Sequence, residues 1–396
     1  CTELTDAEIP AIIYDGDQSL LPEVFERINS KGTTLSKYDI YSASWGNDGF
    51  SVTDSDFSFL YDSICKRYEE MNDSDVCVSD FDSSQYKKDR YINTFDLCFS
   101  FGKLLKKKFP TLFGIDYDSI IVDSIGFNLV NACIGKPSSD LQKLNINLQP
   151  FKDKIQILLR RIIESASTVD GFLKVITTLK GNSAKTLPVL HSENQIISII
   201  ASIFFARFAI VSKDDNDKIA SVSLSNNEND TWLSKKPKFE KNIPIVYVED
   251  SLSYSWSGTG DKKLYNVICD LGYYLRDFSK DDFDNVYNTW FNNVCHQRNE
   301  EKSVKSPTST DKILLNIYTA QTVSAVDAYN NKPWDIEHIC PKKQMKEALS
   351  RINASLANEE DQLKLPISSI GNICYLPSSL NRSKEEKTIY QAGLNS

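Results

Sequence analysis

The chain has 396 residues, of which 41% are hydrophobic and 25% are charged, and its formal net charge is −9. One hydrophobic core rarely grows to this length, so the composition predicts a folded protein of two or three domains and excludes a largely disordered chain. The acidic balance argues against a protein that coats nucleic acid through a basic surface. Lysine clusters such as residues 103–108 are candidates for local phosphate contacts, although a solvated face is the simpler explanation.

The nine cysteines are single residues without any Cys-x-x-Cys pair. This pattern favours reduced thiols in a cytoplasmic protein over a zinc ribbon or a disulfide framework. No stretch resembles a signal peptide or a transmembrane span, so we expect no membrane partner. The first residue is Cys and not Met, so we expect the chain to be a piece of a longer protein.

The predicted elements begin with a short strand at residues 9–14 and a helix that starts near Leu20 and stops at Gly32. Ser36 is a typical N-cap for a second helix, which runs to Trp45.

From about residue 51 to 211, apolar residues recur at helical spacing, which predicts a large helical body. Its most apolar stretch, residues 196–211, predicts a buried helix.

Residues 212–240 are polar and predict an exposed connection at a domain boundary. The next Gly-rich segment, residues 257–261, invites comparison with a phosphate loop, but it lacks the Lys-Ser/Thr of that motif and a plain turn is favoured. The expected segments are therefore 1–50, 51–211, 212–240 and 241–396.

The most informative stretch follows a predicted helix at residues 311–318 and runs from Trp334 to Lys387. It contains Glu337-His338, then a Gly-Asn pair ending at Asn372, then Asn381 at the head of a basic segment. The chain has only three histidines, so one within such a group of polar residues is notable.

These residue types suit hydrolysis of a phosphodiester. A hard divalent cation such as Mg²⁺ prefers oxygen ligands, which Glu337 and Asn381 offer. The imidazole of His338 is mostly neutral at cytoplasmic pH and can take a proton from water. Neighbouring residues on a strand point to opposite faces, so Glu337 and His338 are expected to have different roles.

The segment resembles the HNH, or ββα-metal, nuclease motif of GmrSD-type modification-dependent restriction endonucleases. The matching pieces are Ile-Glu-His-x-x-Pro at 336–341, Ile-Gly-Asn at 370–372, and Asn381 followed by basic residues. This resemblance implies a mainly α protein with a small α+β part and a C-terminal nuclease fold. It also implies cleavage of DNA with Mg²⁺ or Mn²⁺, in restriction or defence against foreign or modified DNA.

The resemblance further assigns roles to single residues. His338 corresponds to the general base, with Glu337 and Asn381 as metal ligands. Asn372 corresponds to the residue that orients the histidine and ties the hairpin together. Lys384, or alternatively Lys387, corresponds to a phosphate contact.

Residues 24–32 resemble the end of the ParB-like N-terminal domain of the same family, with Phe25 and Asn29 at the edge of a nucleotide pocket or, equally, forming a core-plus-cap pair. The Asp-Gly-Gln-Gln-Arg motif of that domain is missing. A remnant ParB-like domain is therefore expected at residues 1–50, and a nucleotide is expected as a partner only if the missing motif lies upstream.

Other functions stay open at this point. A non-catalytic recognition or regulatory scaffold with a degenerate nuclease fold is the main alternative, and the same metal chemistry would also cleave RNA. A structural histidine is the alternative for His338, although the accompanying Glu, Gly-Asn and Asn favour the catalytic role, and a turn residue is the alternative for Asn372. An oligomer is compatible with everything above.

Overall fold

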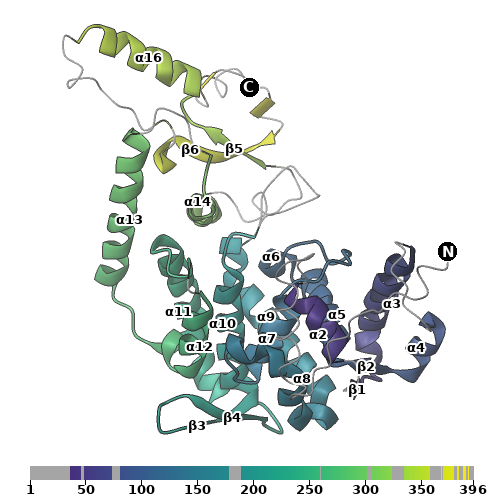
Figure 1. The fold of residues 1–396 in the computed structure, drawn as a ribbon. Helices are drawn as coiled ribbons and strands as arrows, with labels where there is room; N and C mark the ends of the chain where they lie inside the picture. The colour runs from purple at the N-terminus through teal and green to yellow at the C-terminus, as the bar shows by residue number, and fades with distance from the viewer. Residues whose placement is uncertain are drawn as a thin grey trace, which may run out of the picture. The chain divides into compact units, whose positions relative to one another are not determined.

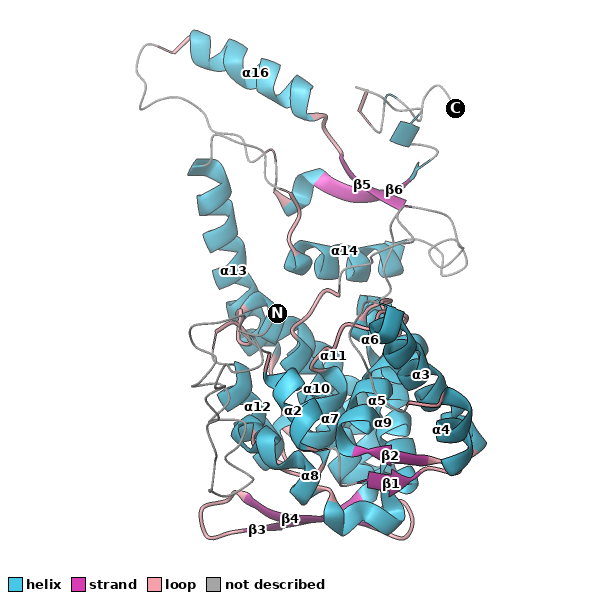
Figure 2. Ribbon diagram, turned by 45° about the vertical axis from the view of Figure 1, so that its right-hand side comes forward, coloured by secondary structure: helices cyan, strands magenta, loops and turns pink. Residues whose placement is uncertain are grey.

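The computed structural model describes residues 36–45, 49–73, 81–177, 189–258, 260–300, 306–322, 334–356, 367, 369–378, 381–382, 387–388 and 391. Over these residues the protein is mainly helical and carries three short antiparallel two-stranded sheets (Figures 1 and 2). The predicted mainly α class is confirmed.

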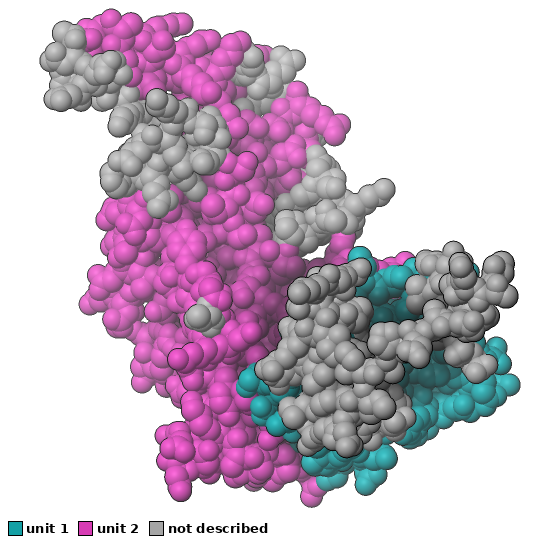
Figure 3. All heavy atoms as spheres, viewed as in Figure 1, with its two compact units in different colours: residues 1–102, 120–127, 139–157 teal, residues 103–119, 128–138, 158–396 magenta. Residues whose placement is uncertain are grey.

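The chain divides into two compact units (Figure 3). Unit 1 comprises residues 1–102, 120–127 and 139–157, and unit 2 comprises residues 103–119, 128–138 and 158–396. Three helices contribute residues to both units: α5 (Thr94–Lys108), α7 (Ile125–Cys133) and α9 (Ile155–Thr177). Each unit is therefore assembled from segments that are distant in sequence.

The remaining elements of unit 1 lie wholly or almost wholly within it. They are α2 (Lys37–Ser44), β1 (Gly49–Ser51), η4 (Ser55–Phe57), α3 (Ser58–Asp73), α4 (Ser83–Asp89), β2 (Tyr91–Asn93), η5 (Ser138–Lys143), α8 (Leu144–Asn147) and η6 (Gln149–Lys154). Helix α2 begins directly after Ser36, as the predicted N-cap requires. Strands β1 and β2 pair antiparallel from Gly49↔Asn93 to Ser51↔Tyr91.

The core of unit 1 contains a buried carboxylate. Asp96 is 1% exposed and accepts hydrogen bonds from the Tyr68 hydroxyl at 2.8 and 2.9 Å, and from Asn93 Nδ2 at 2.8 Å. Burial raises the pKa of this carboxyl, although its hydrogen bonds with the Tyr68 hydroxyl oppose the rise. Its hydrogen-bond donors compensate part of the cost of removing the charge from water.

Unit 2 holds the other elements. They are α6 (Pro110–Phe113), α10 (Glu193–Phe208), β3 (Ala209–Lys213), β4 (Ile219–Leu224), α11 (Trp232–Leu252), α12 (Gly260–Cys269), η7 (Tyr273–Leu275), α13 (Lys280–Glu300), α14 (Ser309–Thr322), β5 (Trp334–His338), α16 (Lys342–Ala354), η9 (Ile370–Asn372) and β6 (Ile373–Pro377).

Helix α10 is the centre of unit 2. Its residues are buried on every side, including Ile196, Ile200 and Phe204 at 0% exposure, and it packs against α11 and α12. A helix that is apolar all round belongs in a core. The predicted buried helix is confirmed, but it ends at Phe208 and the next residues form β3.

For residues 212–240 the structure differs from the prediction in part. These residues are largely exposed, as predicted, but they also form most of the β3–β4 hairpin and the first turns of α11. The division between the compact units does not fall there. The hairpin side chains are largely exposed, which explains why the sequence is polar although the backbone is ordered by strand pairing.

The lysine cluster at residues 103–108 is a second correction. Lys103 is 1% exposed and Lys106 is 5% exposed, and Lys106 Nζ lies 2.8 Å from Asp116 Oδ1. These two lysines point into the protein, whereas Lys107 and Lys108 are exposed, so only part of the cluster is a solvated face. Within the described part of the chain, no helix has the length and apolar character needed to cross a membrane.

His191 is a partly buried polar residue of unit 2. Its Nε2 lies 2.9 Å from the Leu112 carbonyl, and its Nδ1 lies 2.8 Å from the Tyr247 hydroxyl. A neutral imidazole satisfies both partners, with Nε2–H donating to Leu112 and Nδ1 accepting from Tyr247. Burial lowers the pKa of His191 to about 4, against a smaller opposing effect of the Leu112 carbonyl.

Helix α14 supports the C-terminal hairpin. Its first turn is capped reciprocally, because Asp311 Oδ2 accepts from the backbone and hydroxyl of Thr308 while Asp311 N donates to the Thr308 hydroxyl. This is the arrangement of a capping box. The helix packs beside β6, as both ribbon views show (Figures 1 and 2).

Candidate active site

The predicted motif folds into an antiparallel hairpin. Strands β5 and β6 pair without a register shift from Trp334↔Pro377 to His338↔Ile373. Helix α16 lies between them in sequence and has no buried residue. The two halves of the motif, more than 30 residues apart in the chain, are thereby brought side by side.

Strand alternation assigns the side chains of the hairpin to two faces. Asp335 and Glu337 share one face, together with their cross-strand partners Leu376 and Cys374. His338 belongs to the other face with Trp334. The structure therefore separates the carboxylates from the imidazole, as the alternation argument predicts.

His338 is 7% exposed, whereas Asp335 and Glu337 are half-buried. Its position is the last of β5, directly before the turn that leads to Pro341, the N-cap of α16. The burial of the imidazole was not foreseen from sequence.

Asn372 fixes the turn after His338. Its Oδ1 accepts from the Cys340 backbone amide at 2.9 Å, while its Nδ2 donates to the Ile367 carbonyl at 2.9 Å and to Cys340 O at 3.3 Å. Its own carbonyl accepts from the Ile339 backbone amide at 2.9 Å. One amide side chain, 9% exposed, therefore joins the exit of β5 to the entry of β6.

Asn381 reaches back to the hairpin. Its Nδ2 donates to Asp335 Oδ2 at 3.1 Å. Asp335 shares its strand face with Glu337, so the contact brings Asn381 to the face that carries both carboxylates. An Asn whose amide nitrogen is held by a carboxylate has its amide oxygen oriented by that bond.

Asp335 is the member of this group that the sequence analysis left without a role. The sequence already indicated that Asp335 could share a site with Glu337, because the two are two residues apart and a strand places such residues on one face. What was missing was the Asn381 contact across 46 residues.

The atoms of this group that could bind a metal ion are oxygens, from the two carboxylates and the one amide. Among the described residues, no group of three or more His, Cys, Asp or Glu side chains is placed to hold a metal ion. Such a cluster would suit zinc, whereas two carboxylates with an amide oxygen suit a hard cation that keeps several waters.

The other predicted site residues are placed as follows. Phe25, Asn29 and Lys384 lie outside the described residues. Lys387 is described and exposed.

The Gly-rich segment before α12 is fixed by contacts between side chains of the protein. Trp256 Nε1 donates to Asp250 Oδ2 at 2.8 Å, and Lys263 Nζ lies 3.1 Å from Asp250 Oδ1. Gly258 has φ +80°, which side chains rarely adopt, so a glycine is needed there. These contacts favour the plain turn over the phosphate loop.

Compared with known proteins, the chain matches no family model, and no curated protein and no solved structure matches it.

Proposed function

We propose that the β5–β6 hairpin and the segment after it form an HNH-type site that hydrolyses the phosphodiester bonds of DNA. The observation that carries this proposal is the hydrogen bond between Asn381 and Asp335, which gathers two carboxylates and an amide on one face of the hairpin. The chain order of Glu337-His338, Asn372 and Asn381 also matches the order in the HNH motif.

The residues fit a divalent cation. Asp335, Glu337 and Asn381 would hold Mg²⁺ or Mn²⁺ through oxygen atoms. When bound, such an ion supplies charge neutralisation at the phosphate and stabilises the leaving oxygen. The carboxylates would otherwise repel a phosphodiester, so the same face without a cation is unsuited to DNA.

The protein residues have separate tasks in this proposal. His338 accepts a proton from the attacking water through its imidazole. Asn372 holds the turn that begins at Ile339, so the backbone that carries His338 stays fixed. Lys387 or Lys384 contacts the substrate phosphate. For His338 to act, water must reach the face on which its ring is buried.

The biological role proposed is restriction or defence against foreign or modified DNA, and it rests on the resemblance alone. A second candidate function is a non-catalytic scaffold that keeps the nuclease fold. The 7% exposure of His338 favours this candidate, because a buried imidazole on the face away from the carboxylates is poorly placed to activate water.

Titration of the purified protein with Mn²⁺, followed by electron paramagnetic resonance, separates ion binding from catalysis. We expect one saturable site in the wild type and about tenfold or greater weakening in Glu337→Ala and Asp335→Ala, because each removes a carboxylate. Glu347→Ala is the matched control, since Glu347 lies on α16 with half of its side chain exposed, close to Arg351. Binding that is equal in all four proteins would refute the metal site.

Cleavage of plasmid DNA and of a single-stranded RNA, each with Mg²⁺ or Mn²⁺, then tests the reaction. The proposal expects nicking of DNA by the wild type and loss of at least about a hundredfold in His338→Ala, the usual contribution of a general base. Ion binding without cleavage of either substrate would favour the scaffold, and cleavage of RNA alone would change the substrate class.

A further inference from the structure

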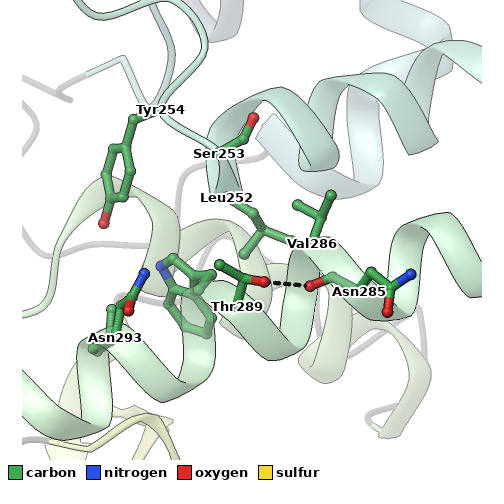
Figure 4. A pocket seen from close by; sticks show the side chains of 9 residues that line it. Leu252, Ser253, Tyr254, Asn285, Val286, Thr289 and Asn293 are labelled. Atoms are coloured by element: carbon green, nitrogen blue, oxygen red, sulfur yellow. Dashed lines mark hydrogen bonds between the residues drawn. The ribbon is translucent and has the colours of Figure 1, made fainter.

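A cavity of ≈ 630 Å³ lies between the C-terminal end of α11 and one side of α13, within unit 2 (Figure 4). Its volume is in the range of sites that bind small organic molecules. It is lined by residues 252–254, at and after the end of α11, and by six residues of α13. None of these side chains is charged.

Helix α13 presents two parallel rows to the cavity. Asn285, Thr289 and Asn293 follow one another at four-residue spacing and form a polar row. The row beside it is apolar and contains Trp290, flanked one turn away on each side by a valine. Residues four apart share one helix face, so an apolar wall and a row of two amides and one hydroxyl line the same space.

Trp290 provides an unused hydrogen-bond donor. The residue is 3% exposed, and its Nε1–H has no acceptor among the residues that the structure describes. By contrast, the Nε1–H of buried Trp256 donates to Asp250. Buried polar groups of native proteins are nearly always paired, so an unpaired donor on a residue that lines a cavity suggests an acceptor supplied by a ligand.

Tyr254 lies on the opposite side of the cavity from α13. Its backbone has φ +52°, in the left-handed region that residues other than glycine seldom occupy, and its ring is 55% exposed. Figure 4 shows the hydroxyl end of this ring directed toward Asn293. Backbone strain of this kind is often found at ligand sites.

We propose that this cavity binds a neutral nucleobase ring. A carboxamide both donates and accepts, which is how Asn side chains pair with the edge of a base, and aromatic side chains bind the flat face of any base by stacking. The lack of a charged side chain among the lining residues disfavours a phosphate inside the cavity. The base would belong to a free nucleoside or to a nucleotide turned out of a DNA strand. The inference does not depend on the chemistry of the hairpin.

Isothermal titration with adenosine, guanosine, cytidine and thymidine tests the proposal. We expect saturable binding of at least one nucleoside by the wild type, weakened about tenfold by Trp290→Phe, which keeps the ring and removes the donor. Asn293→Ala, at an exposed position that does not threaten folding, is expected to weaken binding similarly. Asn216→Ala, in the exposed β3–β4 turn, is the matched control and should bind as the wild type does.

The two possible sources of the base, a free nucleoside and a nucleotide turned out of a DNA strand, are distinguished with duplex DNA. A duplex with one unpaired, extrahelical base is compared with the fully paired duplex, for the wild type and Trp290→Phe. Preference for the unpaired base that depends on Trp290 assigns the cavity to a base turned out of DNA, and binding of nucleosides alone assigns it to a free nucleoside. Absence of saturable binding of any nucleoside or unpaired base, or binding unchanged by both substitutions, would overturn the proposal. A failed nuclease assay would not affect it.

Discussion

Protonation of His191 is expected to weaken the folded state as the pH falls, and the size of the effect follows from its surroundings. The folded pKa of about 4 lies below the reference value of 6.5, so the folded state binds this proton less readily than the unfolded state does. The contribution of neutral His191 to the free energy of unfolding is therefore fully present above pH 6.5 and is lost as the pH falls from 6.5 to about 4. At ~1.4 kcal/mol per pKa unit, the full loss is about 3 kcal/mol, of which about 2 kcal/mol is already lost at about pH 5.

The perturbation that isolates this effect is His191→Gln. Its amide can donate to the Leu112 carbonyl and accept from the Tyr247 hydroxyl, the same pair of partners that the neutral imidazole serves, but it does not titrate. The measurement is urea unfolding, followed by tryptophan fluorescence at about pH 8 and about pH 5. Titration of all other groups is common to the two proteins and cancels in the comparison.

We expect the free energy of unfolding of the wild type to fall by about 2 kcal/mol more than that of His191→Gln over this interval. A constant offset between the proteins is allowed, because Gln and His differ in shape. Parallel pH profiles would refute the reasoning, since they would mean that the folded protein accommodates the imidazolium as readily as water does.

Two further predictions concern unit 1, with one control in unit 2. Gly126→Ala should lower the free energy of unfolding by more than about 2 kcal/mol, because the added Cβ would clash with the Cys98 carbonyl oxygen. Gly171→Ala is the control: a Cβ there has nothing within 4 Å, so the substitution should raise the free energy of unfolding by up to about 1 kcal/mol. Tyr68→Phe should cost about 1.5–3 kcal/mol by removing a hydrogen bond to buried Asp96, and Tyr91→Phe, at a ring 46% exposed, should cost almost nothing. Chemical denaturation measures both, and equal effects within either pair would contradict these arguments.

Much of the fold was predictable because it depends on local pattern. The period of apolar residues indicated the helical body, and Ser36 marked the start of α2. The apolar stretch at residues 196–211 was correctly predicted as a buried helix up to Phe208, because its composition leaves no broad polar face for water, but its last three residues belong to β3. The β3–β4 hairpin was missed for the opposite reason: its exposed residues Ser212 and Ser221 face solvent and each other, so the strands lack the alternation that reveals a half-buried sheet.

By itself, the sequence determined which residues could form a site: a Glu-His pair, a Gly-Asn pair and an Asn ahead of basic residues, in the order of a known motif. Only the tertiary structure decided which of them meet. Alternation along β5 already separates His338 from Asp335 and Glu337, but only the pairing of β5 with β6 brought Asn372 to the turn after His338, and only the return of the chain brought Asn381 to Asp335. The burial of Lys103, His338 and Trp290 was likewise set by packing. Spacing along a strand or helix fixes the direction of a side chain, but its exposure and partners depend on segments far away in the chain.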